Sequence, residues 1–258
     1  MDWTRARGLL WASALLTALL AAPAGAQDSQ DDPDAAFTTA EEEAIRQLVR
    51  DYLLANPELV IEAAQAYRAQ QQELEQQQAR EMLVSLRPEL DRDPNSPVIG
   101  NPDGDVVVVE FFDYRCPYCV RVAKDLRETV ESDGNIRLVM KEFPILGPES
   151  VTAARMALAA EQQGKYEDLH FALMTISGHF SERKAFKIAE DLGLDLDRLR
   201  RDMEAPEIDA MLQRNFELAQ ALQINGTPAF VIGEEIVRGA IDMESLRIIV
   251  GQTRANSS

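Results

Sequence analysis

The chain contains two cysteines, Cys116 and Cys119, which are three residues apart. They enclose Pro117 and Tyr118, directly after an apolar run and at the start of a segment with helical periodicity. Unpaired N–H groups at a helix N-terminus favour a thiolate, so we expect a lowered pKa for Cys116. A spacing of three places Cys119 on the same helical face, within disulfide reach. The motif therefore predicts a redox pair, with Cys116 as the exposed attacking sulfur and Cys119 as the buried resolving sulfur.

Two other uses of such a cysteine pair are half of a zinc site and a local structural disulfide. Zinc usually takes four ligands, and only His170 and His179 could add nitrogen ligands, far from any other ligand pattern. A disulfide between residues three apart closes a very small loop and contributes little stability. We therefore predict no metal site, and we interpret the two histidines as helix-surface or turn residues without a role.

A second motif, Asn225-Gly226-Thr227-Pro228, directly precedes the apolar segment Ala229–Ile232. Proline is confined to edge, first or bulge positions of a sheet, so its place at the start of this segment is informative. A Gly-Thr-Pro turn that enters a strand favours a cis peptide bond before the proline. A trans proline that ends the preceding helix is the alternative, and the C-x-x-C unit upstream favours the cis form.

The apolar patterns predict that strands and helices share one domain. A β-branched and aromatic run at Val106–Phe112 predicts a strand buried on both faces, and a second strand follows at Asn135–Phe143. A loop over Asp91–Gly104 precedes them, and a helical insertion at about 149–222 follows. The other predicted elements are helices at Val120–Val130, Val151–Glu161, Tyr166–Met174, Arg183–Leu192, Leu196–Met203, Pro206–Leu222 and Asp242–Thr253, and strands at Ala229–Ile232 and Glu235–Arg238. This order predicts an α/β sandwich with a mixed sheet.

The N-terminal residues 1–26 have the features of a cleaved signal peptide. Arg5 and Arg7 precede the apolar run Gly8–Ala22, and Ala24-Gly25-Ala26 fits the small-residue rule for cleavage. An uncleaved anchor is the alternative, although the run is short for a membrane span. Residues 27–37 are acidic and are predicted to be a disordered tail.

Residues 38–90 predict a helical extension that could join copies of the chain. Thr38 and Glu41 have the spacing of a capping box, and Asn56-Pro57 predicts the start of a second helix toward Leu86. An apolar residue recurs every seven positions along that helix, in a surface otherwise rich in glutamine. These residues are Val60, Tyr67 and Leu74. A thin apolar stripe cannot build a core alone, so it favours self-association over a solvated helix lying against the main domain.

The formal net charge of the chain is −18, with 44 acidic and 26 basic residues. Such acidity argues against a nucleic-acid or anionic-membrane surface, because phosphate neutralisation needs clustered Lys and Arg. Export would place the cysteine pair in an oxidising compartment, where a pair this closely spaced is better explained by chemistry than by stapling.

From about Asn95 to Thr253 the chain resembles the DsbA-like family of thioredoxin-fold thiol:disulfide oxidoreductases. The resemblance rests on the segment from Glu110 to Cys119, the helical insertion and Gly226-Thr227-Pro228. It implies a thioredoxin fold with an inserted helical subdomain, and exchange chemistry that needs no organic cofactor or metal. It also implies site roles for five further residues. Thr227 and a cis Pro228 would hold the substrate peptide as an added strand, with Pro117 and Tyr118 beside it, and Glu110 would be a buried acid that handles the proton of the resolving thiol.

Two departures from the strongly oxidising members leave the direction of exchange open. The dipeptide between the cysteines is Pro-Tyr where those enzymes have Pro-His, which removes a positive neighbour of the thiolate and predicts a less oxidising couple. Thr227, rather than valine, precedes the proline, as in periplasmic isomerases. The N-terminal helices also resemble those of ScsC-type proteins, in which such an extension joins protomers.

We therefore predict a periplasmic enzyme that exchanges disulfides with unfolded or misoxidised secreted proteins. A membrane redox partner would reset the cysteine pair. The alternatives are an oligomeric disulfide isomerase or reductase, and a chaperone-like module in which redox activity is secondary. Retention of cellular activity by a double cysteine variant would favour the chaperone-like module.

Overall fold

The computed structural model describes residues 37–176 and 180–256, so the predicted signal peptide, most of the acidic tail and His179 lie outside the described residues. The chain divides into two units, whose boundary falls between Ala66 and Tyr67. Helix α2 (Glu58–Asp91) begins in the first unit and ends in the second. None of the described helices is long and apolar enough to cross a membrane.

The described part of the first unit is helical, and most of its apolar side chains are exposed. Helix α1 (Thr39–Ala55) begins at a capping box, in which Glu41 N–H donates to the Thr38 hydroxyl and Thr38 N–H donates to the Glu41 carboxylate. This confirms the predicted N-cap. No residue of α1 is buried, and Leu48 is 69% exposed. The seam residues of α2, Val60, Tyr67 and Leu74, are exposed as well.

The second unit contains a five-stranded mixed sheet in the order β1-β3-β2-β4-β5, which confirms the predicted fold class. Strand β2 runs parallel to β3 and antiparallel to β4, and β5 forms the edge beyond β4. The bounds are β1 (Val98–Gly100), β2 (Val106–Phe112), β3 (Ile136–Glu142), β4 (Ala229–Ile232) and β5 (Glu235–Arg238). Strand β1 lies in the segment predicted as a loop, because its three residues follow Pro97, end in a glycine and carry no periodicity.

Alternation along β2 and β3 sends side chains to two separate apolar clusters. Val108 and Leu138 belong to a cluster with helix α3 (Pro117–Asp133), whereas Val109 and Val139 pack on the opposite face. The pattern places two acids, Glu110 and Glu142, on the face that α3 covers. The apolar residues Val108, Phe112, Leu138 and Met140 lie on the same face. Both acids are buried.

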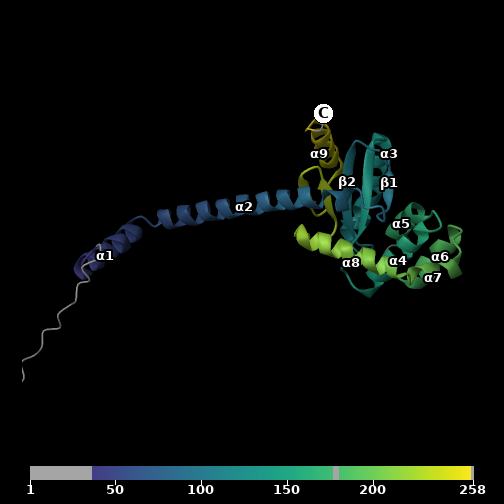
Figure 1. Ribbon diagram of the computed structural model, residues 1–258, viewed down its shortest axis with the longest axis horizontal. Coiled ribbons are helices and arrows are strands. Elements are labelled where there is room, and N and C mark those ends of the chain that lie inside the picture. The colour runs from purple at the N-terminus through teal and green to yellow at the C-terminus, as the bar shows by residue number, and fades with distance from the viewer. Residues whose placement is uncertain (1–36, 177–179, 257–258) are drawn as a thin grey trace, which may run out of the picture. The chain divides into compact units, whose positions relative to one another are not determined.

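The other helices lie close to their predicted positions. They are α4 (Pro148–Glu161), α5 (Tyr166–Met174), α6 (Glu182–Asp191), α7 (Leu196–Met203), α8 (Pro206–Ala221) and α9 (Met243–Asn256). Figure 1 shows α4, α5, α6 and α7 grouped together, away from α9. The helical insertion therefore forms a subdomain beside the sheet, between β3 and β4 in the chain.

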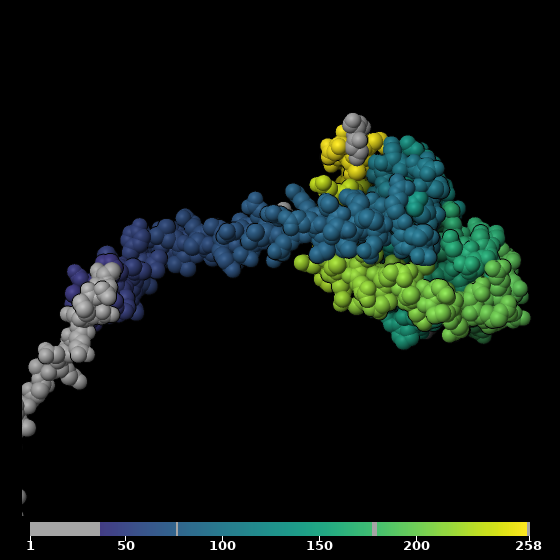
Figure 2. All heavy atoms as spheres, in the orientation of Figure 1, coloured from purple at the N-terminus to yellow at the C-terminus, as the bar shows by residue number. Residues whose placement is uncertain are grey.

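The last turns of α2 are part of the core of the second unit. Leu83 and Leu90 are buried in the same cluster as Leu218 of α8, and Figure 2 shows the spheres of α8 along those of α2. The helix continues through Pro88 and ends at Asp91, five residues past its predicted end at Leu86. The buried Lys141 of β3 donates to the Glu89 carbonyl (2.8 Å), so this end of α2 is tied to the sheet.

Candidate active site

The cysteine pair lies where β2 gives way to α3. Cys116 is the N-cap of α3, and Pro117 occupies its first turn, where no N–H partner is needed. The loop between strand and helix is closed by the Cys116 N–H, which donates to the Asp113 carbonyl (3.0 Å). The Asp113 carboxylate accepts from the N–H groups of Arg115 (2.7 Å) and Leu146 (3.0 Å). The segment before Cys116 is therefore fixed by several hydrogen bonds.

The turn before β4 faces the cysteines. The Cys116 thiol donates to the carbonyl oxygen of Thr227, with Sγ and oxygen 3.2 Å apart. The Thr227–Pro228 peptide bond is cis, which confirms the prediction made from the sequence. The two motifs are more than a hundred residues apart in the chain, and antiparallel pairing of β4 with β2 brings them together.

Cys116 is less exposed than predicted. Its exposed fraction is 4%, and that of Cys119 is 0%. The prediction of an exposed attacking sulfur was wrong because the Thr227 turn lies against the Cys116 sulfur, which sequence spacing does not show. Cys119 is buried as predicted, one turn into α3.

The two thiols have pKa values shifted in opposite directions. The pKa of Cys116 is lowered to about 5, chiefly by the hydrogen bond from the Cys119 thiol and also by the backbone N–H groups of Cys119 and Tyr118, against the opposing effect of burial. Burial raises the pKa of Cys119 strongly, and the hydrogen bond to Cys116 and the charge of Glu110 add to the rise. Cys116 is therefore the thiolate at neutral pH and Cys119 the thiol.

Glu110 is buried beneath α3, with an exposed fraction of 2%. It pairs in register with Met140 on one side and Phe230 on the other. Burial, with a smaller contribution from the Cys116 thiolate, raises the pKa of Glu110 to about 8. A carboxyl group with this pKa can hold and release a proton near neutral pH, which is the property that the predicted role requires.

Tyr118 and Pro117 are the exposed residues of the motif, and Tyr118 has an exposed fraction of 52%. The guanidinium of Arg121, one turn later in α3, lies over its ring at 5.1 Å from the centroid. The Pro-Tyr dipeptide predicted the loss of a positive neighbour, yet Arg121 supplies an exposed positive group beside the motif. The spacing of three between Tyr118 and Arg121 on one helix was the sequence signal for this pair.

A buried hydrogen-bonded group near the motif was missed from the sequence. The Glu142 Oε1 atom accepts from the hydroxyls of Tyr114 (2.9 Å) and Tyr166 (3.0 Å). The Tyr114 hydroxyl also lies 3.0 Å from Nδ1 of His170, whose ring stacks on Tyr166. The strand alternation that buries Glu142 was the available signal.

His170 is therefore not the helix-surface residue that the sequence predicted. It is 1% exposed, and burial, with a smaller effect from Arg127, lowers its pKa to about 3, so its ring is neutral. Over residues 37–176 and 180–256, no three His, Cys, Asp or Glu side chains are grouped closely enough to hold a metal ion.

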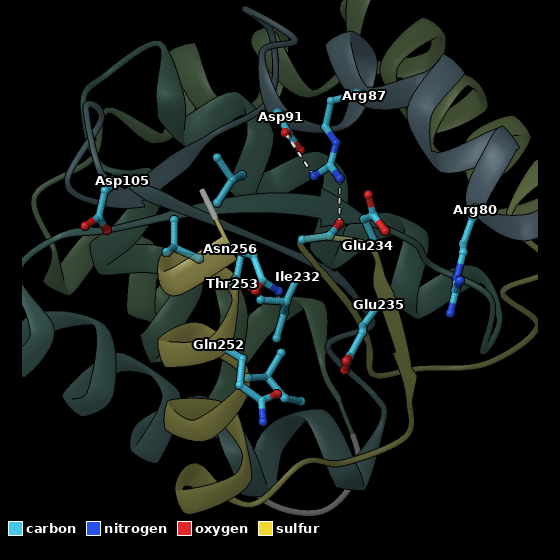
Figure 3. A pocket seen from close by; sticks show the side chains of 14 residues that line it. Arg80, Arg87, Asp91, Asp105, Ile232, Glu234, Glu235, Gln252, Thr253 and Asn256 are labelled. Carbon is cyan, nitrogen blue, oxygen red and sulfur yellow. Dashed lines mark hydrogen bonds and ion pairs between the residues drawn. The ribbon is translucent and has the colours of Figure 1, made fainter. Parts of the chain in front are cut away.

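A cavity of about 530 Å³ opens at the far end of β2 and β4 from the cysteines, and its lining includes Val106 and Ile232. Figure 3 shows Arg87 of α2 between Asp91 and the turn after β4. Arg87 donates to the Gly233 carbonyl (2.6 Å) and forms an ion pair with Asp91 (3.3 Å). This arrangement tethers α2, and the cysteine pair lies at the opposite end of the sheet.

The chain is similar to solved oxidoreductase structures. A thioredoxin-like oxidoreductase from Silicibacter pomeroyi DSS-3 is 51% identical, with a TM-score of 0.64 over 66% of this chain and 98% of that chain. Proteus mirabilis ScsC in a transitional conformation is 32% identical, with a TM-score of 0.63 over 85% of this chain and 100% of that chain.

Curated relatives share only part of their length with this chain. The chain is 29% identical over 172 residues to the Na(+)/H(+) antiporter NhaA 1 of Salinispora arenicola (strain CNS-205), which covers 66% of this chain and 26% of the antiporter. The chain thus spans about a quarter of the length of such relatives.

Two protein families match the chain in consecutive regions. The copper resistance protein ScsC N-terminal domain matches residues 41–81, which include α1 and much of α2. The DSBA-like thioredoxin domain matches residues 107–250, more than half of the chain, and this region contains both cysteines and the Thr227–Pro228 turn. The chain therefore belongs to the DsbA-like family of thioredoxin-fold thiol:disulfide oxidoreductases, with an ScsC-type N-terminal domain.

Proposed function

We propose that this chain exchanges disulfides with exported protein substrates through Cys116 and Cys119. The observation that carries the proposal is the position of the Cys116 sulfur, at the start of α3 and 3.2 Å from the Thr227 carbonyl. A lowered pKa of about 5 makes this sulfur both a ready nucleophile and a good leaving group.

In the oxidising direction, a substrate thiolate attacks Cys116 in the Cys116–Cys119 disulfide. A mixed disulfide forms between substrate and Cys116, and the Cys119 sulfur leaves with the electron pair of the broken bond. A second substrate thiolate then attacks the substrate sulfur of the mixed disulfide. The substrate gains a disulfide, Cys116 leaves as a thiolate, and the enzyme holds the two electrons as a dithiol.

Glu110 is proposed to supply the proton that the leaving Cys119 sulfur needs. Cys119 is buried and its pKa is strongly raised, so its thiolate would be unstable in this position. The Glu110 carboxyl, with a pKa of about 8, is mostly protonated at neutral pH and can give up its proton there. In the reducing direction Cys119 must lose that proton before it attacks the mixed disulfide, and Glu110 then accepts it.

The backbone of the Thr227–Pro228 turn is proposed to align the substrate beside Cys116. Main-chain groups of an extended peptide can pair with a backbone edge, which gives affinity for many sequences. The Thr227 carbonyl oxygen lies 3.2 Å from the Cys116 sulfur, so a peptide paired at this turn would have its sulfur within reach of Cys116. Pro117 and the exposed Tyr118 are proposed to form the neighbouring contact surface.

An oligomeric isomerase is the second candidate function, and the exposed apolar surface of the N-terminal helices favours it. Six large apolar side chains of α1 are between 39% and 69% exposed. These are Ile45, Leu48, Val49, Tyr52, Leu53 and Leu54. A second copy of the chain would cover such a surface, and joined protomers could hold several cysteine pairs near one misoxidised substrate.

We further propose that the protein works in the periplasm, since Arg5, Arg7 and the following apolar run have the features of a signal peptide. Its substrates there would be unfolded or misoxidised secreted proteins. Continued turnover would need a membrane redox partner to reset the cysteine pair. Nucleic acid is not a proposed partner, because the net charge is −18.

Cysteine variants test the proposed exchange. Cys116→Ser should abolish turnover of a scrambled disulfide substrate, because it removes the attacking sulfur. Cys119→Ser is the matched control, since it keeps that sulfur and removes only the resolving one, and it should accumulate mixed disulfides visible by mass spectrometry. Wild-type turnover by Cys116→Ser would refute the proposal. The ratio of dithiol oxidation to disulfide rearrangement by the wild type would separate oxidase from isomerase.

A further inference from the structure

Tyr114 connects the active-site loop to a buried acid that the exchange reaction does not use. It stands two residues before Cys116, in the loop that follows β2. Its hydroxyl donates to Glu142 Oε1 at 2.9 Å, and both side chains are buried. Glu142 ends β3, and in the register of the sheet it is opposite Phe112, the last residue of β2.

The polar atoms of four side chains meet in this group. The Tyr114 hydroxyl donates to Glu142 and lies 3.0 Å from Nδ1 of the neutral His170 ring. Tyr166 donates the second hydrogen bond to the same Glu142 oxygen, at 3.0 Å.

Aromatic packing holds this group rigidly against the loop. The Phe112 ring meets Tyr114 edge to face at 5.3 Å between centroids, and it meets His170 in the same way at 4.9 Å. His170 and Tyr166 both belong to α5, so the group connects the helical subdomain to the start of α3. The Tyr114 side chain is therefore fixed at its hydroxyl end and on the face of its ring.

We propose that Glu142 is a positioning residue for the cysteine pair, and that it acts through Tyr114. By fixing Tyr114, it holds the following residues so that the N–H groups of Tyr118 and Cys119 point at the Cys116 sulfur. Tyr166 and His170 complete the group and orient Glu142, and neither stands in the loop itself. The proposal rests on the proposed function, because it assigns Glu142 a part in stabilising the reactive thiolate.

Two tyrosine variants form a matched test. Tyr114→Phe and Tyr166→Phe each remove one hydroxyl donor to the same Glu142 oxygen, but only Tyr114 lies in the active-site loop. Titration of the thiolate absorbance of the reduced full chain measures the pKa of Cys116. We expect Tyr114→Phe to raise that pKa by roughly 0.5 to 1, the scale of one hydrogen bond, and Tyr166→Phe to change it by less than about 0.2.

Glu142 variants test the acid itself. Glu142→Gln keeps an oxygen that can accept from both tyrosines, so the Cys116 pKa should stay near the wild-type value, whereas Glu142→Leu should raise it as Tyr114→Phe does. Equal pKa values in Tyr114→Phe and Tyr166→Phe, or an unchanged pKa in a folded Glu142→Leu variant, would overturn the proposal. Wild-type turnover of a scrambled substrate is measured in parallel, because a failure there would count against the proposed function, whereas the tyrosine comparison tests the positioning role.

Discussion

The two units of this chain handle apolar side chains in opposite ways. In the second unit, apolar residues of both sheet faces are enclosed by helices, and the buried Lys141 has hydrogen-bond partners. In the described part of the first unit, α1 buries nothing and exposes a run of apolar side chains. The second unit thus has an apolar core of its own, whereas the helix of the first unit has an exposed apolar surface.

Along helix α2, apolar side chains change from exposed to buried. Val60, Tyr67 and Leu74 are exposed, whereas Leu83 and Leu90, further along the same helix, are buried in the core of the second unit. The apolar residues are similar in type, so their type alone does not decide burial. What differs is that the last turns of α2 have the sheet and α8 to pack against.

The largest expected effect is the loss of stability when a buried leucine in the last turns of α2 is shortened. Leu90→Ala should lower the free energy of unfolding of the second unit by about 2 to 5 kcal/mol, because it leaves a cavity in a filled core. Urea denaturation at low protein concentration measures this change without a contribution from association.

The matched variant in α1 is Leu48→Lys. Leu48 is 69% exposed, so this change should alter the free energy of unfolding by no more than about 0.5 kcal/mol. It should instead lower the mass measured by light scattering, since a charged side chain opposes burial between copies. A wild-type chain that is monomeric at all concentrations would remove the oligomer proposal, and a large loss of stability in Leu48→Lys would contradict the contrast between the units.

The next effect concerns the buried acid beneath the cysteines. The pKa of Glu110 is raised from 4.5 to about 8 in the folded protein, so between these pH values the folded state holds a proton that the unfolded chain has lost. The stabilising contribution is present below about pH 4.5 and is lost as pH rises toward 8, at up to about 1.4 kcal/mol per pH unit.

Glu110→Gln cannot lose a proton, and its stability should therefore fall less steeply over this range. Urea denaturation of the reduced protein at several pH values compares the two slopes. Burial also raises the pKa of Glu142, so Glu142 contributes to the pH dependence of stability in both proteins. Only the difference between the two slopes is therefore assigned to Glu110. Identical slopes would mean that Glu110 is ionised when folded and cannot be the proposed proton donor.

Much of the fold and the reactive centre could be predicted from the sequence, because local patterns encode them. The apolar run of β2, the proline at the first turn of α3 and the Thr227–Pro228 turn each carry their own signal. Contacts between segments that are distant in the chain have no such local signal. The near-complete burial of Cys116 depends on a turn more than a hundred residues away, and the burial of His170 depends on Tyr114 and Glu142. Strand β1 was missed because three residues are too short for periodicity.

The smallest expected effect concerns the exposed side of the site, where solvent weakens charge interactions. Arg121 lies over the ring of Tyr118, and its charge should favour the nearby thiolate slightly. Arg121→Ala should therefore raise the pKa of Cys116 by a few tenths, measured by thiolate absorbance at low ionic strength, and added salt should shrink the difference. Lys124→Ala is the matched control, because it removes an exposed positive charge from the same helix one turn further from the cysteines. If both variants raised the pKa equally, the effect would come from net charge, and the stacked geometry of Arg121 on Tyr118 would have no specific role.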